Sequence, residues 1–199
     1  MGRIGNKKDK VICQDNETEK IIPSIEEIEL AIMNNRDFYF RQNLMVFRVS
    51  DFSGIVNHEC DCLIMSKTGY LTEIEIKRSY SDFLADFKKK HKHDDERISK
   101  FYFMVHTSFA DKVFEKLIKE NMIPQGIYTY DDNTYIKLYK TCADFKNKIL
   151  NEDITYYRSS SPRKLFIEEK YQLARLGAMR YKNMTEKLIK KEKINEFRK

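Results

Sequence analysis

Apolar residues along the chain follow two spacings, one typical of helices and one typical of strands. Ser24 precedes apolar residues that recur every three to four positions, and Glu27 completes a capping box, so we expect a helix from Ser24 to about Asn35. Ser79 or Ser81 is expected to cap a second helix and Ser108 a third. After the first helix, the expected order is three strands, a helix, a strand, a helix, a hairpin and a helix: 44–49, 59–77 (two strands around a Gly-containing turn), 79–91, 101–105, from 108 onward, 127–139 and 142–150.

Strands that alternate with helices predict the α/β class, with a layered domain built on a mixed sheet flanked by helices. The run Ser159-Ser160-Ser161-Pro162 is typical of a hinge. We therefore expect one domain over 1–160 and a basic helical extension over 161–199. Apolar residues between Leu165 and about Phe197 predict one or two helices in that extension.

Composition is that of a folded protein, because 41% of the 199 residues are hydrophobic, which is enough for a sizeable core. No run of about 18 apolar residues occurs, and the N-terminus lacks the apolar stretch of a signal peptide. We expect a cytoplasmic protein with no membrane contact. In a reducing compartment, Cys60 and Cys62 are expected to be free thiols that share one strand face as small buried side chains.

Positive charge is concentrated at the C-terminus. Of the 37 Lys and Arg residues, 12 lie in 161–199 beside 5 acidic residues, so the extension carries a net +7 and the other 160 positions a net −1. The extension also has an apolar stripe, so three alternatives stay open: it docks on the domain, it pairs with a second copy in a homodimer, or it lies along nucleic acid. In the last case we expect Arg175, Arg180 and Lys190 to contact phosphates.

Charged residues stand inside the two strands of 59–77, where burial would be costly without a partner. Alternation places Glu73, Glu75 and Lys77 on one face, and in a hairpin Asp61 would meet Glu75 from the neighbouring strand. Two converging carboxylates repel each other unless a cation lies between them or one of them takes a proton. Mg²⁺ is commonly held by one or two carboxylates, and an ammonium nearby can stabilise charge on a phosphoryl group. The alternative is an exposed sheet face with cross-strand ion pairs.

The sequence Asp61 followed by Glu75-Ile76-Lys77, behind a helix that carries Glu29, resembles the PD-(D/E)xK nuclease superfamily. The stretches EIEIKRSYSDFLADFKKKHKH and ISKFYFMVH are similar to the MmcB-like DNA-repair family and to related phage and bacterial proteins, over about residues 24–130. This resemblance implies a restriction-endonuclease-like fold. It also implies that Asp61 and Glu75 bind Mg²⁺ or Mn²⁺, that Lys77 positions water, and that Glu29 assists. Glu-Cys-Asp replaces the superfamily's Pro-Asp here.

Other charged residues near this motif have a structural and a functional interpretation. Glu59 and Glu73 are expected to pair with Lys or Arg across the sheet, with an outer role at the metal as the alternative. His58 could act as a base or contact phosphate, and Asp86 could reach the site, although pairing with a nearby lysine is favoured. Lys88 and Lys92 are expected to contact the phosphate backbone.

The leading hypothesis from the sequence is a nuclease that hydrolyses DNA with Mg²⁺ or Mn²⁺, in DNA repair, recombination or phage DNA processing. The first alternative is a catalytically inactive nucleic-acid-binding module of the same fold. The second is a small interaction protein that binds a partner through the 161–199 extension.

Overall fold

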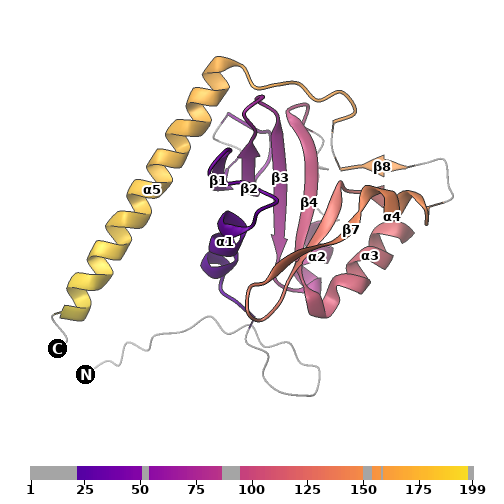
Figure 1. Cartoon of the computed structure of the whole chain (residues 1–199), viewed down its shortest axis with the longest axis horizontal. Helices are drawn as coiled ribbons and strands as arrows, with labels where there is room; N and C mark the ends of the chain where they lie inside the picture. The colour runs from indigo at the N-terminus through magenta and orange to yellow at the C-terminus, as the bar shows by residue number, and fades with distance from the viewer. Residues whose placement is uncertain (1–21, 51–53, 87–94, 150–153, 158, 197–199) are drawn as a thin grey trace.

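The architecture is seen in a computed structural model, which describes residues 22–50, 54–86, 95–149, 154–157 and 159–196 (Figure 1). Strands alternate with helices along the chain, so the predicted α/β class is confirmed. The elements are α1 (Ile25–Asn34), β1 (Leu44–Val49), β2 (Cys60–Met65), β3 (Leu71–Lys77), α2 (Tyr80–Asp86), β4 (Ile98–His106), the 3-10 turn η2 (Thr107–Phe109), α3 (Ala110–Lys119), β5 (Met122–Ile123), β6 (Gly126–Tyr130), β7 (Ile136–Thr141), α4 (Cys142–Lys146), β8 (Thr155–Tyr156) and α5 (Ile167–Glu196).

The main sheet has six strands in the order β1-β2-β3-β4-β6-β7. The first three strands are antiparallel to one another, β3 to β4 and β4 to β6 are parallel, and β6 to β7 is antiparallel. This arrangement confirms the predicted mixed sheet. Each parallel pair requires a crossover connection. The helix α2 lies in the connection from β3 to β4, and α3 lies in the connection from β4 to β6.

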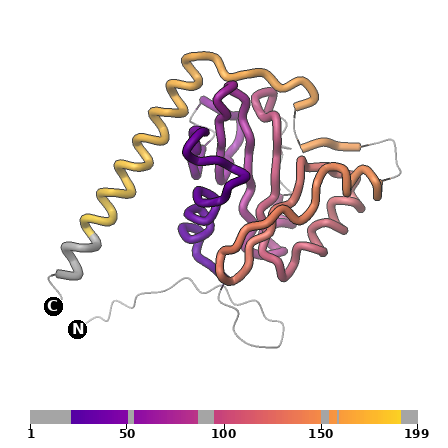
Figure 2. The backbone as a smooth tube through the Cα atoms, in the orientation of Figure 1, coloured from indigo at the N-terminus to yellow at the C-terminus, as the bar shows by residue number. Residues whose placement is uncertain are grey.

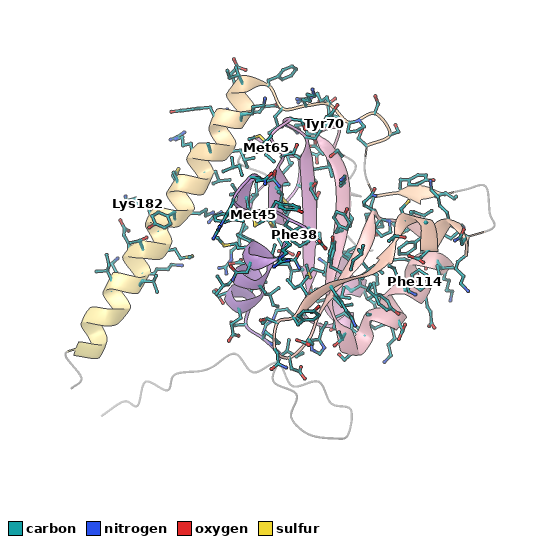
Figure 3. All side chains as sticks on the ribbon, in the orientation of Figure 1. Phe38, Met45, Met65, Tyr70, Phe114 and Lys182 are labelled. Atoms are coloured by element: carbon teal, nitrogen blue, oxygen red, sulfur yellow. The ribbon has the colours of Figure 1, made fainter. Side chains whose placement is uncertain are left out.

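Both faces of the sheet are covered, which explains why its central strands are apolar on both sides. On one face, Ile28 and Ile32 of α1 pack with Ile74 and Ile76 of β3. On the other face, Phe101 and Phe103 of β4 pack with Phe83 of α2. Figure 3 shows the same division: Phe38 and Met45 lie beside α1, whereas Phe114 lies among α3 and α4.

The predicted caps are mostly confirmed. Ser24 and Glu27 form the capping box at the start of α1, and Ser79 Oγ accepts the Asp82 N–H at 3.1 Å, which selects Ser79 over Ser81 for α2. The prediction that Ser108 caps the third helix is wrong. Ser108 lies inside η2, and the His106 side chain accepts its backbone N–H there instead.

The C-terminal extension forms one long helix, α5, which packs on β1 at the edge of the sheet. Leu173 is completely buried there, as part of the same apolar cluster as Val46 and Leu63. Figure 2 traces this segment, orange to yellow, along the side of the domain next to the indigo N-terminal elements. Docking on the domain, one of the three alternatives that the sequence left open, is therefore confirmed for the part of α5 around Leu173. Further along, Met184 and Leu188 are 58% and 55% exposed.

The alternation of β2 is interrupted at Asp61, which corrects one prediction. Cys60 and Cys62 are both buried, as expected, but they belong to apolar clusters on opposite faces of the sheet. Arg48, the residue that the β1–β2 register places opposite Asp61, has a positive φ of 55°. A residue in the left-handed region breaks the pleat, so side chains beyond it no longer follow the strand alternation.

Every described helix falls short of the length or the apolar character needed to cross a lipid bilayer.

Candidate active site

Two carboxylates meet where β2 and β3 separate. The backbone register of these strands runs from Met65–Leu71 to Cys62–Ile74. One residue further on, side chains take over the hydrogen bonds: the Asp61 N–H donates to Glu75 Oε1 at 3.3 Å, and the Ile76 N–H donates to Asp61 Oδ2 at 2.8 Å. Each carboxylate is thus anchored to the neighbouring strand. The structure thus brings Asp61 and Glu75 to one point of the sheet, and their part in metal binding and catalysis stays a prediction.

Lys77 joins this pair from the same strand as Glu75, as the alternation in β3 predicts. Its ammonium donates to Glu75 Oε2 at 2.8 Å and lies 2.6 Å from Asp86 Oδ2. The Lys77, Glu75 and Asp86 side chains are only 4%, 3% and 2% exposed. Burial disfavours the charged ammonium, but Glu75 and Asp86 more than compensate, so the pKa of Lys77 is raised above its ordinary value. Lys77 is therefore a cation at neutral pH.

Asp86 belongs to this site, although the sequence favoured its pairing with a lysine on its own helix. Asp86 ends the described part of α2, and its neighbours Lys89 and Lys90 lie outside the described residues. The spacing from Ser79 could have indicated the contact between Asp86 and Lys77. A helix capped at Ser79 packs Phe83 against the sheet, and Asp86 follows Phe83 by almost one turn, so both side chains lie on the same face of the helix.

A second buried pair lies next to the first along β3. His58 Nε2 lies 2.9 Å from Glu73 Oε1, and the side chains of both residues are completely buried. Burial lowers the pKa of His58, but the hydrogen bond and charge of Glu73 outweigh it and raise the pKa above its ordinary value. Glu73 was expected to pair with Lys or Arg, and this expectation is corrected: a histidine reaches it from the loop before β2.

A pocket of about 290 Å³ opens beside the carboxylates. Its charged lining residues are Glu59, Asp61, Glu75, Arg48 and Arg180. A larger pocket, about 700 Å³, lies between the end of α1 and β7 and contains none of the predicted site residues. The smaller pocket is therefore the candidate substrate site, because it combines both carboxylates with two arginines.

Glu29 faces Arg48 and is not among the residues that line this pocket. Arg48 donates to Glu29 through Nε at 2.7 Å and to Glu26 through Nη2 at 2.7 Å. These hydrogen bonds raise the pKa of Arg48, the one with Glu29 most, and the Arg48 hydrogen bond lowers the pKa of Glu26. Glu29 thus acts on the pocket by positioning Arg48, and a direct part in catalysis stays a prediction.

The donor set fits a hydrated magnesium ion. Among the described residues, no group of three or more His, Cys, Asp or Glu side chains is arranged to hold a metal ion. Magnesium needs only one or two carboxylates, because it keeps several waters and binds substrate phosphate oxygens. Asp61 and Glu75 supply two carboxylates at the pocket, whereas Cys60 and Cys62 lie on opposite faces of the sheet and cannot complete a zinc site together.

The predicted phosphate-contacting residues separate in the structure. Arg180 lines the pocket, whereas Arg175 and Lys190 are exposed on α5 outside it. Lys88 and Lys92 lie outside the described residues. Sequence reasoning missed Arg48, because nothing in the local pattern of β1 indicates its left-handed backbone or its contact with α1.

Comparison with known proteins gives distant matches. No family model matches the chain. The chain is similar to the ribosomal RNA small subunit methyltransferase A of Borreliella burgdorferi, with 26% identity over 118 residues, covering 52% of this chain and 40% of the relative. The enzyme of the same name from Borreliella afzelii is 30% identical over 81 residues, covering 34% and 29%. The chain therefore spans well under half the length of these curated relatives.

The chain is also similar to a solved structure, the SPO1766 protein of unknown function from Silicibacter pomeroyi. Its TM-score is 0.49 with 14% sequence identity, covering 84% of this chain and 92% of that chain.

Proposed function

We propose that this chain is a metal-dependent nuclease of the PD-(D/E)xK type, with a restriction-endonuclease-like core, which hydrolyses phosphodiester bonds in DNA. The observation that carries the proposal is the convergence of Asp61, Glu75 and Lys77 beside one pocket. The order of elements supports it as well: α1 precedes three antiparallel strands, and α2 leads from them to the parallel strand β4.

Asp61 and Glu75 would hold Mg²⁺ or Mn²⁺ at the pocket. When bound, such an ion polarises the phosphoryl group and lowers the pKa of a bound water. Asp61 is kept in position by the Ile76 N–H and Glu75 by the Asp61 N–H, so neither carboxylate has to reorganise when substrate arrives. Lys77 has a raised pKa, so it serves as a fixed positive charge that orients water and stabilises the developing negative charge.

Plasmid nicking with Mg²⁺ and with EDTA tests the proposal. The wild-type chain is expected to nick only with the metal. Asp61→Asn keeps the shape and one acceptor for the Ile76 N–H, and it is expected to lower the rate by about 10²–10³-fold, the scale of losing one preorganised electrostatic group. Glu168→Gln removes the same charge from the exposed start of α5 and is expected to cleave like the wild type. Equal cleavage by Asp61→Asn would reject the mechanism.

Lys77→Ala separates chemistry from binding. Cleavage is expected to be lost. DNA affinity, measured by fluorescence anisotropy, is expected to survive largely, because the Lys77 side chain is buried and does not line the pocket. Since the curated relatives are named for an action on ribosomal RNA, the substrate panel includes a structured RNA beside single-stranded, double-stranded and branched DNA.

The alternative is a nucleic-acid-binding module without activity. The observation that favours it is the basic helix α5, whose region 161–199 carries a net +7 while the other 160 positions carry a net −1. Binding by the wild type without cleavage of any substrate, in Mg²⁺ and in Mn²⁺, would select this alternative.

A further inference from the structure

Arg180 enters the acidic pocket from a distant part of the chain. It lies on α5, and its Nη2 donates to the backbone carbonyl of Arg48 at 2.6 Å, across 132 positions of sequence. Both arginines line the pocket that contains Asp61 and Glu75. The pocket is therefore bipolar, with carboxylates from β2 and β3 and guanidinium groups from β1 and α5.

The position of Arg180 is fixed by close contact between α5 and β1. A Cβ at Gly177 would lie 3.3 Å from Val46 Cγ2, so the helix backbone approaches the strand closely at this point. Leu173, one turn earlier, is completely buried. Arg180 follows Gly177 by almost one turn and lies on the same side of α5, which brings its side chain over the end of β1.

The two arginines differ in how their charge is balanced. The Arg48 guanidinium is paired with Glu26 and Glu29 of α1. For Arg180, no carboxylate in the described ranges lies within ion-pair distance, and its guanidinium donates to the neutral carbonyl of Arg48. A guanidinium has five N–H donors in a planar fork. Arg180 therefore has both charge and donors to offer to an anion.

We infer that Arg180 binds a phosphate group of a nucleic-acid strand next to the Asp61–Glu75 pair, and that the helix α5 is therefore part of the substrate site. The inference rests on the proposed function only in taking that anion to be a phosphodiester. Arg and phosphate form bidentate, charge-assisted hydrogen bonds. An acidic pocket repels a phosphodiester, so a cation opposite the carboxylates is needed to draw the strand in. Arg48 is the positioning residue, because its carbonyl orients the Arg180 guanidinium.

Binding of a fluorescent 12-nucleotide single strand, measured by anisotropy in EDTA with the full chain, tests the inference. Arg180→Ala is expected to weaken binding by about tenfold, equivalent to about 1.4 kcal/mol, and to reduce the slope of log affinity against log salt by about one. Arg180→Lys keeps the charge but lacks the planar guanidinium, and its strand affinity is expected to lie between those of the wild type and Arg180→Ala. Lys182→Ala removes an equal charge two residues along the same helix, at the position labelled on α5 in Figure 3. It is expected to change affinity by less than twofold, because Lys182 is 73% exposed and paired with Glu186.

A second variant moves the helix without changing any charge. In Gly177→Leu, the new side chain is too large for the space between Gly177 and Val46. The helix α5 must therefore shift on β1 and carry Arg180 away from the pocket. It is expected to weaken strand binding as Arg180→Ala does, while circular dichroism and thermal unfolding confirm that the domain is folded. The double variant Gly177→Leu/Arg180→Ala is expected to bind no more weakly than either single variant, because both act on the same contact.

Two outcomes would overturn the inference. The first is wild-type affinity in Arg180→Ala, even if the chain cleaves DNA with Mg²⁺. The second is equal affinity of the wild type for inorganic phosphate and for the 12-nucleotide strand, which would assign the pocket to a small phosphate ligand. Arg180-dependent strand binding without any metal-dependent cleavage would support the phosphate site and reject the proposed nuclease, so the two proposals fail separately.

Discussion

Replacing Lys77 by methionine tests the electrostatic arrangement of the site independently of any activity. Methionine is similar in length to the lysine stem, so the change removes the ammonium while leaving little empty space. In the wild type, this ammonium lies 2.8 Å from Glu75 and 2.6 Å from Asp86, and all three side chains are at most 4% exposed. Lys77→Met therefore removes a buried cation that lies against two buried carboxylates.

The expected loss of unfolding free energy is about 3–5 kcal/mol, the cost of removing one partner from a buried ion pair. A domain of this size has about 5–15 kcal/mol in total, so the variant remains measurable but clearly weakened.

Urea denaturation followed by circular dichroism measures this loss. Lys67→Met removes an exposed lysine from the turn before β3 and is expected to stay within about 0.5 kcal/mol of the wild type. Asp86→Asn completes a double-mutant cycle with Lys77→Met, and the two losses are expected to be non-additive by about 0.5–3 kcal/mol. A loss below about 1 kcal/mol for Lys77→Met, or strict additivity with Asp86→Asn, would contradict the buried three-residue arrangement.

The remaining predictions concern other parts of the fold. Because Glu73 raises the pKa of His58, the pair stabilises the fold fully below the ordinary histidine pKa, and this stabilisation is lost as the pH rises through the raised pKa. The urea midpoint of the wild type should therefore decline between pH 6 and 9, and that of His58→Gln should stay flatter. Gly126→Ala would place a Cβ 2.6 Å from the Lys140 carbonyl oxygen and is expected to cost about 1–3 kcal/mol, and an unchanged thermal midpoint would contradict the close approach of β6 and β7. Leu173→Ala should cost about 2–5 kcal/mol in the same unfolding assay if α5 is part of the folded unit, and a negligible loss would show that α5 detaches in solution.

Local patterns predicted the elements well because their causes are local. The capping box of Ser24 and Glu27 acts within one helical turn, and the alternation in β3 needs only the pleat of one strand to bring Glu75 and Lys77 to one face. The mixed sheet followed from the order of these elements. Ser108 was misassigned as a cap because the turn η2 begins before it, and His106 caps that turn by accepting the Ser108 N–H.

Partners of the buried charges depended on contacts between distant segments. Nothing in the local sequence distinguishes His58 from an arginine as the partner of Glu73, because the loop before β2 decides which side chain arrives. Asp86 reaches Lys77 only because α2 packs its Phe83 side onto the sheet. Residue spacing predicted that Asp61 and Glu75 would meet, whereas the packing of α2 decided that Asp86 would join Glu75 at Lys77.

By itself, the sequence determined the order of helices and strands, the shared face of Glu75 and Lys77, and the meeting of Asp61 with Glu75, because periodicity and strand pairing act over short distances. Tertiary structure decided that Arg48 adopts a left-handed backbone, that the strands part to seat the carboxylates, and that Arg180 comes from the far end of the chain to face them. These features arise where buried charges must find partners, and the available partner is set by which segments pack together in three dimensions.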